Sequence, residues 1–495
     1  MDVLAAFARL LQPDTLLYLV GGYLLGLVFG AIPGLTATLA IALLLPFTFA
    51  MELTNALVMV MAIFMAGIYA GSITGIIVNI PGAPSGAITT IEGHVLMRRG
   101  EGAKALGLDA LASSIGGMIG ALVLMFVALP MSKVALLFQT PDKFALVVLA
   151  LVTVVVVTPG SIWKGIISLV LGLMVATVGL DAMIAQARFA FGSPQLVEGV
   201  RLLPAVIGLF AICEMLVQAG TKRRGIVTGE FKVRRRDFIP SFAEIRRVGF
   251  LTYIKSAVIG VFIGMLPGGG ASMASFIAYA EARRTSKEPE TYGKGSHEGL
   301  AAAECANNAM CGGAVVPLLT LGIPGDSVTA IIFGVLLIHG LVPGPGLLEN
   351  SIGVIAPMFA ALFVAAALVF VSVILFGPYY IWLARMNRAV LYALIAMVAM
   401  VGTYASTFSI FQMWVALAIG LFAYVMRVLG YSVVPMLMGI ILGPYFEEYL
   451  RRALITNELS PLVFITSPIS ATLLVLTCLF VWLLRIRPAR RSAKA

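Results

Sequence analysis

Long apolar segments separated by short polar loops run through almost the entire chain. The first series of segments covers about residues 15–49, 54–80, 105–129, 143–158, 161–180 and 201–219. The second series covers about residues 250–281, 301–323, 328–342, 353–377, 389–405, 411–427, 431–443 and 469–485. Continuous apolar runs predict α-helices, because the strands of a transmembrane β-barrel alternate apolar and polar residues. With about 20 residues for one membrane crossing, the segments predict about 10–12 transmembrane helices.

The composition places these helices in a membrane. Apolar residues make up 60% of the 495 residues, and charged residues make up 11%. Soluble domains carry roughly 25% charged residues, so this chain could not cover a soluble surface of its size. The net charge of +10 comes from basic residues in loops between apolar segments, which is typical of membrane proteins and not of nucleic-acid-binding surfaces. The predicted fold class is therefore an all-α polytopic membrane protein.

One long polar segment, residues 221–249, divides the chain into two halves. It contains nine Lys and Arg residues and three acidic residues, which places it in the cytoplasm by the positive-inside rule. We therefore expect a first unit over 1–220, a basic cytoplasmic connector, and a second unit over 250–455. A C-terminal helix with a basic cytoplasmic tail is expected over 456–495.

Two Pro-Gly motifs of the first half recur in the second half at nearly constant spacing. The segment 30–38, GAIPGLTAT, matches 264–272, GMLPGGGAS, at an offset of 234 residues. The segment 79–82, NIPG, matches 322–325, GIPG, at an offset of 243 residues. Such self-similarity predicts a duplicated unit of about 200 residues. Equivalent loops of the two copies carry opposite charge bias, so we expect the copies to be inverted in the membrane.

Each of these motifs interrupts a helix inside an apolar segment. Proline removes a backbone donor and glycine allows unusual dihedral angles, so the freed backbone groups need protein, water or ligand as partners. We expect re-entrant hairpins near 15–49 and 250–282, and broken helices near 54–92 and 301–342. The N-terminal ends of the half-helices would direct N–H groups toward a carboxylate. The alternative is that the small residues at the breaks only allow close helix packing.

Ionisable residues are scarce in the apolar segments, and each one is a functional candidate. Glu304, Asn307 and Asn308 lie at i, i+3 and i+4 of a predicted helix and share one face. Such a face could hold Na⁺ or a proton, whereas the alternative is an interfacial Glu304 that caps the helix or pairs with Lys294 or His297. The candidate Na⁺ ligands are Asn79, Glu304, Asn307, Asn308 and Thr320.

Enzyme signatures are missing from the sequence. His297-Glu298 is not followed by the second His that a zinc-binding helix requires, and no phosphate-binding loop with the Gly-x-x-x-x-Gly-Lys-Ser/Thr pattern is present. The four cysteines lack the spacing of a zinc site. We therefore expect no catalytic residues, no ATP hydrolysis, no metal-based catalysis and no cofactor other than Na⁺ or H⁺.

Four segments carry a resemblance to a known family: GAIPGLTATLAIALLLPFTF, YAGSITGIIVNIPGAPSGAITT, GMLPGGGASMASFIAYAEARRTSK and AAAECANNAMCGGAVVPLLTLGIPGDSVTAIIFGVLLIHGLVPGPGLL. They are similar to the large membrane subunit of tripartite tricarboxylate transporters, the TctA family, over about residues 15–455. The resemblance implies a multi-pass secondary transporter of the bacterial inner membrane. Its partners would be a small four-helix membrane subunit and a periplasmic solute-binding protein. Its substrates would be di- or tricarboxylates such as citrate, or related organic acids, taken up with Na⁺ or H⁺ as the coupling ion.

The residues at the four breaks form the candidate substrate site. No Lys or Arg occurs in the windows 30–38, 70–90, 264–276 and 304–329, so backbone N–H groups, hydroxyls and co-transported cations must balance the bound anion. Asp326 fits a helix N-cap at least as well as a ligand contact. The candidate substrate-binding residues are Pro33, Gly34, Thr36, Thr38, Asn79, Pro81, Gly82, Ser85, Pro267, Gly268, Gly269, Gly270, Ser272, Gly322, Pro324, Gly325, Asp326 and Ser327.

Two other functions remain as alternatives at this point. A passive organic-anion channel would need a continuous polar stripe along several helices, whereas the polar residues here gather at the breaks. An intramembrane enzyme would need a general base or a metal-binding set. By analogy with other hairpin-containing carboxylate transporters, we expect an elevator-like alternating-access motion.

Overall fold

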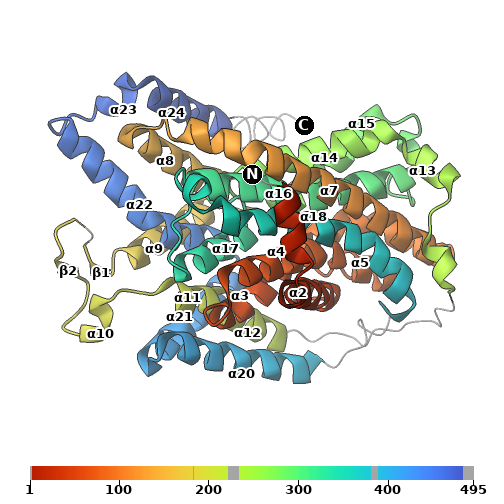
Figure 1. Ribbon diagram of the computed structural model, residues 1–495, viewed down its shortest axis with the longest axis horizontal. Coiled ribbons are helices and arrows are strands. Elements are labelled where there is room, and N and C mark those ends of the chain that lie inside the picture. Colours follow the sequence, from red (N-terminus) through yellow and green to blue (C-terminus); the bar gives the residue numbers. More distant parts are fainter. Residues whose placement is uncertain (1–2, 182, 221–232, 381–387, 483–495) are drawn as a thin grey trace.

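A computed structural model describes residues 3–181, 183–220, 233–380 and 388–482. The first part of the predicted connector, 221–232, and the predicted basic tail, 483–495, lie outside the described residues. Within the described residues the chain is helical apart from one short antiparallel hairpin, β1 (Gly179–Leu180) and β2 (Ala187–Arg188). This hairpin projects from one end of the helical body (Figure 1).

The helices of the first half carry most of the predicted apolar segments. They are α1 (Val3–Leu10), α2 (Pro13–Ala31), α3 (Ala37–Thr48), α4 (Leu53–Ala70), α5 (Ile73–Val78), the 3₁₀ turn η1 (Pro84–Gly86), α6 (Ala87–Arg98), α7 (Gly102–Ala135), α8 (Thr140–Val157), α9 (Ile162–Ala176), α10 (Pro194–Val197), α11 (Leu202–Val206), the π-helical segment η2 (Ile207–Ile212) and α12 (Cys213–Ala219).

The second half begins in the described part of the connector and continues to the C-terminal helix. Its helices are η3 (Arg235–Phe238), α13 (Phe242–Val248), α14 (Phe250–Met265), α15 (Gly270–Thr285), η4 (Pro289–Thr291), α16 (His297–Leu321), α17 (Ser327–Ile338), α18 (Leu347–Phe376), η5 (Gly377–Tyr379), α20 (Arg388–Thr407), α21 (Ile410–Val428), α22 (Val434–Thr456), α23 (Val463–Thr466) and α24 (Pro468–Val481).

Seven helical stretches in the described residues are long and apolar enough to cross a membrane. They are Pro13–Ala31, Leu53–Val78, Gly102–Ala135, Thr140–Val157, Leu202–Ala219, Leu347–Tyr379 and Ile410–Val428. An eighth arises if Arg235–Val248 and Phe250–Met265, bent by 91°, form one span. The all-α polytopic membrane fold is therefore confirmed. Full-length spans in the described residues are fewer than the 10–12 crossings expected from the sequence, because apolar helices such as Ala37–Thr48 and Ser327–Ile338 are shorter than one crossing. Pro13–Ala31, the first arm of the expected hairpin near 15–49, is long enough to cross, and the re-entrant hairpins stay predictions.

Helix α16 forms the centre of the molecule, with almost every residue from Gly299 to Thr320 buried. It packs against α7, α14 and α15 (Figure 1). Glycines bring these helices into backbone contact: Gly116 and Gly120 of α7 lie against the carbonyls of Cys305 and Ala309. In a membrane, where lipid removes the hydrophobic drive for helix association, such close van der Waals packing is a main source of stability.

The pairing of α2 with α4 resembles the pairing of α14 with α16. Gly26 and Gly30 of α2 lie against the carbonyls of Ile63 and Gly67. At the offsets of 234 and 243 residues found in the sequence, Gly260 and Gly264 of α14 lie against the carbonyls of Ala306 and Met310 of α16. A duplicated unit would produce this correspondence, and the duplication and its inversion stay predictions.

The described part of the connector is packed against the helical body. Phe238 is fully buried, with Gly107 of α7 against its carbonyl and Gly377 against its ring. Lys104 and Glu244 form an ion pair at 3.3 Å, which adds a second attachment to the first half. These contacts fix the end of the connector where it leads into α14.

Candidate functional site

The two broken helices end in the same backbone geometry. Helix α5 ends at Asn79 with φ of 58°, and α16 ends at Gly322 with φ of 71°. In both helices the next N–H folds back onto the last turn: Ile80 N donates to Thr74 O at 3.4 Å, and Ile323 N donates to a carbonyl of α16 at 3.2 Å. This left-handed cap needs glycine or asparagine, which explains why these residue types stand at the two breaks.

The two Pro-Gly turns, named here the first tip (Pro33-Gly34) and the second tip (Pro267-Gly268), also share a conformation. Gly34 has φ of 92° and Gly268 has φ of 77°, both in the left-handed region that glycine adopts without strain. After the first tip, Thr36 caps α3 by accepting a hydrogen bond from Leu39 N at 3.2 Å. After the second tip, α15 begins at Gly270 with no side-chain cap. The first N–H groups of α15 therefore donate to no capping side chain.

The tips and breaks contact one another in a closed ring. Gly268 N donates to Gly325 O at 2.7 Å, joining the second tip to the second break. The hydroxyls of Thr38 and Ser327 share a hydrogen bond at 3.2 Å, joining the first tip to the second break. A Cβ on Gly82 would lie 2.5 Å from the carbonyl oxygen of Gly30, so the first break rests on the first tip. Turn η1, just after the first break, packs on α15 and closes the ring.

The ring presents both buried and accessible residues. The second break, from Gly322 to Asp326, is buried. Asn79 and Pro81 at the first break are exposed. Thr38, Pro33, Gly82, Ser85 and Gly269 are buried, whereas Gly34, Thr36, Pro267, Gly268, Gly270, Ser272 and Ser327 are partly exposed. The first break and the two tips are therefore more exposed than the second break.

Asp326 acts as the N-cap of α17. Its carboxylate accepts hydrogen bonds from Thr329 N at 2.8 Å and from Thr329 Oγ1 at 2.7 Å. The capping role that the sequence left open is thus the one present in this conformation.

A second polar cluster lies inside the helical body around Glu304. Ser72 donates to Glu304 Oε1 at 2.6 Å, and Thr89 donates to the same oxygen. Ser113 and Asn307 Nδ2 donate to Oε2 at 3.1 Å and 3.2 Å. The carboxylate is fully buried within α16, so the alternative of an interfacial residue that pairs with Lys294 or His297 is wrong.

Asp109 of α7 lies beside this cluster and was not expected from the sequence. It is fully buried, and its carboxyl group interacts electrostatically with the carboxyl group of Glu304. Apart from this neighbouring carboxyl group, its carboxylate oxygens have no hydrogen-bond partner in the described residues. The signal was present as a lone aspartate in the apolar segment 105–129, four residues before Ser113 and therefore on the same helical face.

Comparison with known proteins decides the family. The model of the tripartite tricarboxylate transporter TctA family matches residues 16–438. The chain belongs to this family. It is 34% identical over 496 residues to an Agrobacterium vitis protein described as an uncharacterized 52.8 kDa protein in the TAR-I ttuC' 3' region, covering 99% of this chain and 96% of the relative. An uncharacterized Agrobacterium vitis protein in the TAR-II ttuC' 3' region is 35% identical over 238 residues, which is 48% of this chain and 97% of that relative. No solved structure matches.

TctA proteins are transporters and not enzymes, and they work with other subunits in a tripartite system. The chain is thus a multi-pass membrane subunit of a transporter. Its candidate Na⁺ ligands do not form one group. Only Glu304 and Asn307 are hydrogen-bonded to each other, whereas Asn308 donates to Met65 O at 3.2 Å. Thr320 lies sixteen residues further along α16, about 24 Å from Glu304, and donates to its own helix. One ion therefore cannot take ligands from both ends of α16.

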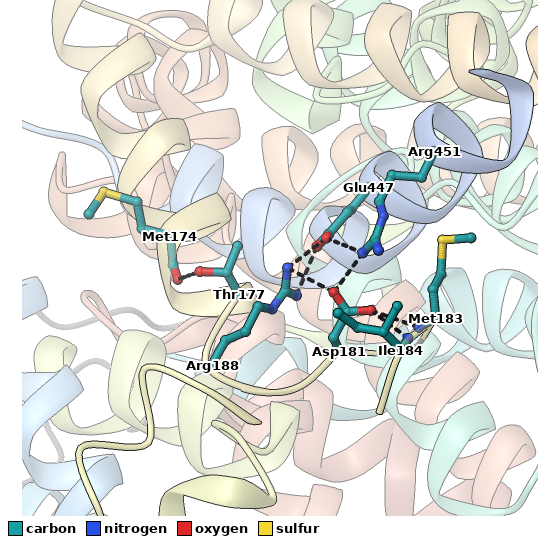
Figure 2. Close-up of polar contacts among 8 residues, drawn as sticks. All are labelled: Met174, Thr177, Asp181, Met183, Ile184, Arg188, Glu447 and Arg451. Atoms are coloured by element: carbon teal, nitrogen blue, oxygen red, sulfur yellow. Dashed lines mark hydrogen bonds and ion pairs between the residues drawn. The ribbon is translucent and has the colours of Figure 1, made fainter. Parts of the chain in front are cut away.

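An ion-pair cluster in this TctA chain fastens the β1–β2 hairpin to α22 (Figure 2). Arg188 donates to both carboxylate oxygens of Glu447 at 2.6 Å and 2.9 Å. Arg451 donates to Asp181 at 2.6 Å and to Glu447 at 2.9 Å. The Arg451 hydrogen bond, with backbone N–H groups such as that of Met183, lowers the pKa of Asp181 to about 2. The cluster is internally neutral and holds the projecting hairpin in place.

Proposed function

We propose that this chain is the permease of a binding-protein-dependent secondary transporter that imports di- or tricarboxylates or related organic acids. The closed ring of contacts among the two tips and the two breaks carries the proposal. It gathers several half-helix ends in one region, and each helix N-terminus offers about half a positive charge to an anion. The four sequence windows contain no Lys or Arg, so no fixed positive side chain there would retain the acid and slow its release.

Coupling to a cation follows from charge balance. A di- or trianion bound by helix ends, hydroxyls and backbone N–H groups keeps uncompensated charge, and co-transported Na⁺ or H⁺ would supply the rest. We further propose bacterial inner-membrane localisation, a cytoplasmic C-terminus, two inverted copies of one unit, and an elevator-like cycle in which the hairpin-bearing domain moves. The equivalent glycine contacts of α2–α4 and α14–α16 support the duplicated unit.

The partners we propose are a small four-helix membrane subunit and a periplasmic solute-binding protein. The test is uptake of a panel of radiolabelled organic acids into proteoliposomes that contain the chain, its small subunit and the binding protein. Saturable uptake should require the binding protein and an inward cation gradient. Uptake that proceeds to equilibrium without a gradient or binding protein would mean a passive channel.

A paired variant tests the ring itself. Thr38→Val with Ser327→Ala removes the hydroxyl pair between the first tip and the second break, and a hydrogen bond of about 1 kcal/mol predicts uptake lowered roughly fivefold. Thr472→Val on α24 removes an exposed hydroxyl that bonds only its own helix, and it should leave uptake unchanged. Equal uptake by the two variants would show that the ring is not part of the transport site.

A further inference from the structure

The pair of buried carboxyl groups at the centre of the molecule has no counter-charge. Asp109 and Glu304 are both fully buried, on helices α7 and α16 that are in backbone contact. No Lys or Arg side chain is buried in the parts of the chain that the structure describes. Two carboxylates side by side in a dry interior are strongly unfavourable unless one of them takes up a proton or a cation joins them.

The hydrogen-bond donors in this cluster are distributed unevenly between the two carboxyl groups. Glu304 is supplied by four donors, namely Ser72, Thr89, Ser113 and Asn307. Apart from the neighbouring Glu304 carboxyl group, the carboxylate oxygens of Asp109 have no hydrogen-bond partner. The side-chain amide oxygen of Asn307, whose NH₂ group donates to Glu304, has no partner either. Buried oxygens are rarely left without a donor, so three of them around one carboxylate point to a missing ligand.

We propose that Asp109, Glu304 and Asn307 bind one Na⁺, which is the coupling ion of the proposed organic-acid transport. The ligand atoms are all oxygens from carboxylates and an amide, which suits a hard cation and not a transition metal. A divalent ion fits less well, because the four donors already occupy much of Glu304 and few free oxygens remain for six to eight ligands. The role of the ion in coupling rests on the proposed function, whereas the binding of Na⁺ at this site does not.

The position of the site explains how an ion would affect the substrate region. Ser72 lies at the junction of α4 and α5, just before the first break, and Thr89 lies on α6, just after it. Both hydroxyls donate hydrogen bonds to Glu304 Oε1. A Na⁺ ion that offsets one of the two negative charges and ligates both carboxylates therefore holds the two sides of the first break against α7 and α16. Loading the ion would order the break, and losing it would release the break.

The test is Na⁺ binding to the purified full-length chain in detergent at neutral pH, with two further series of unfolding measurements, one at varied pH and one with CaCl₂ or MgCl₂ in place of NaCl. Radioactive Na⁺ binding and the thermal unfolding midpoint are measured as NaCl replaces choline chloride at constant ionic strength. We expect saturable binding of one Na⁺ and a midpoint that rises with Na⁺. Asp109→Asn should weaken binding at least tenfold, because it removes one carboxylate while keeping the shape. In Na⁺-free buffer this variant should be more stable than the wild type, since the repulsion is gone.

The matched control is Asp142→Asn on α8. Asp142 is also a buried aspartate, but its carboxylate accepts hydrogen bonds from Ser467 and Ser470 N. This change should alter the midpoint and leave Na⁺ binding intact. If Asp109→Asn does not yield a monodisperse protein, Glu304→Gln provides the same test from the other carboxylate.

Three results would overturn the site. They are undiminished Na⁺ binding in Asp109→Asn and Glu304→Gln, stabilisation by Ca²⁺ or Mg²⁺ with none by Na⁺, and stability that changes with pH but not with Na⁺, which would mean a shared proton. Uptake assays separate this failure from failure of the proposed function. Na⁺-driven organic-acid uptake that survives in both variants removes the site but keeps the transporter, whereas Na⁺ binding without any organic-acid uptake keeps the site and removes the substrate class.

Discussion

The contact between α2 and α4 offers a direct test of backbone packing in the membrane domain. A Cβ on Gly26 would lie 2.6 Å from the carbonyl oxygen of Ile63 and 2.8 Å from its Cα. Ordinary contact begins near 3.4 Å, so Gly26→Ala would force the helices apart by about 0.8 Å, the difference of 3.4 and 2.6 Å. Backbone atoms cannot rotate away as a side chain would, so the whole helix must shift.

The energetic cost follows from the number of contacts that the shift weakens. A gap of roughly 0.5–1 Å forfeits a quarter to a half of an atom-pair attraction of about 0.1–0.2 kcal/mol. For roughly 40 such pairs along the interface, the loss is about 2 kcal/mol. This agrees with the roughly 1–3 kcal/mol that overpacking usually costs.

Gly21→Ala on the same helix is the matched control. A Cβ on Gly21 would meet nothing within 4 Å. Both substitutions gain the same helix propensity, up to about 1 kcal/mol, so their difference isolates the packing cost. We expect Gly26→Ala to be less stable than Gly21→Ala by about 2 kcal/mol in unfolding of the detergent-purified chain by sodium dodecyl sulfate. Equal stability of the two variants would refute the reasoning from backbone contact.

Three further predictions concern pH, topology and the second tip. Because the folded pKa of Asp181 is about 2 and its unfolded value is about 3.9, its pairing with Arg451 stabilises the protein above about pH 4, and this is lost as the pH falls toward 2. The thermal midpoint of Asp181→Asn should therefore lie below wild type at neutral pH and converge with it in acid, and a constant gap would contradict this. In a background with Cys478→Ser, Arg235→Cys should react with a membrane-impermeant thiol reagent only from the cytoplasmic side, and periplasmic labelling would overturn both the topology and the inversion. Gly268→Val should abolish uptake in the proteoliposome assay, because a branched residue is strained at φ of 77° and covers the tip, and normal uptake would show that the tip does not meet the substrate.

The helix breaks could be predicted from the sequence because their cause is local. Proline and glycine act on their own backbone, so the interruption near Pro33 was placed correctly, with α2 ending at Ala31 and α3 beginning at Ala37. The left-handed caps at Asn79 and Gly322 follow from residue type in the same way. The apolar segments predicted helices for a related reason, since each helix satisfies its own backbone in lipid.

The polar cluster could be predicted only in part because its geometry depends on tertiary contacts. Glu304 and Asn307 share a face at helical spacing, which sequence reasoning can see. Asp109 lies 195 residues away on another helix, and no periodicity relates it to Glu304. Asn308, by contrast, has the spacing of a ligand but turns to Met65, because adjacent residues on a helix point about 100° apart.

The backbone contacts between α7 and α16 have a mechanical consequence. Gly116 and Gly120 belong to the first half of the chain, and the carbonyls that they meet belong to the second half. Two helices whose backbones are in contact over successive turns cannot slide or rotate against each other without steric clashes between their peptide groups. Helices α7 and α16 therefore belong to one rigid unit, although they come from different halves of the chain. Any relative movement of helices in this protein must run along other contacts than this one.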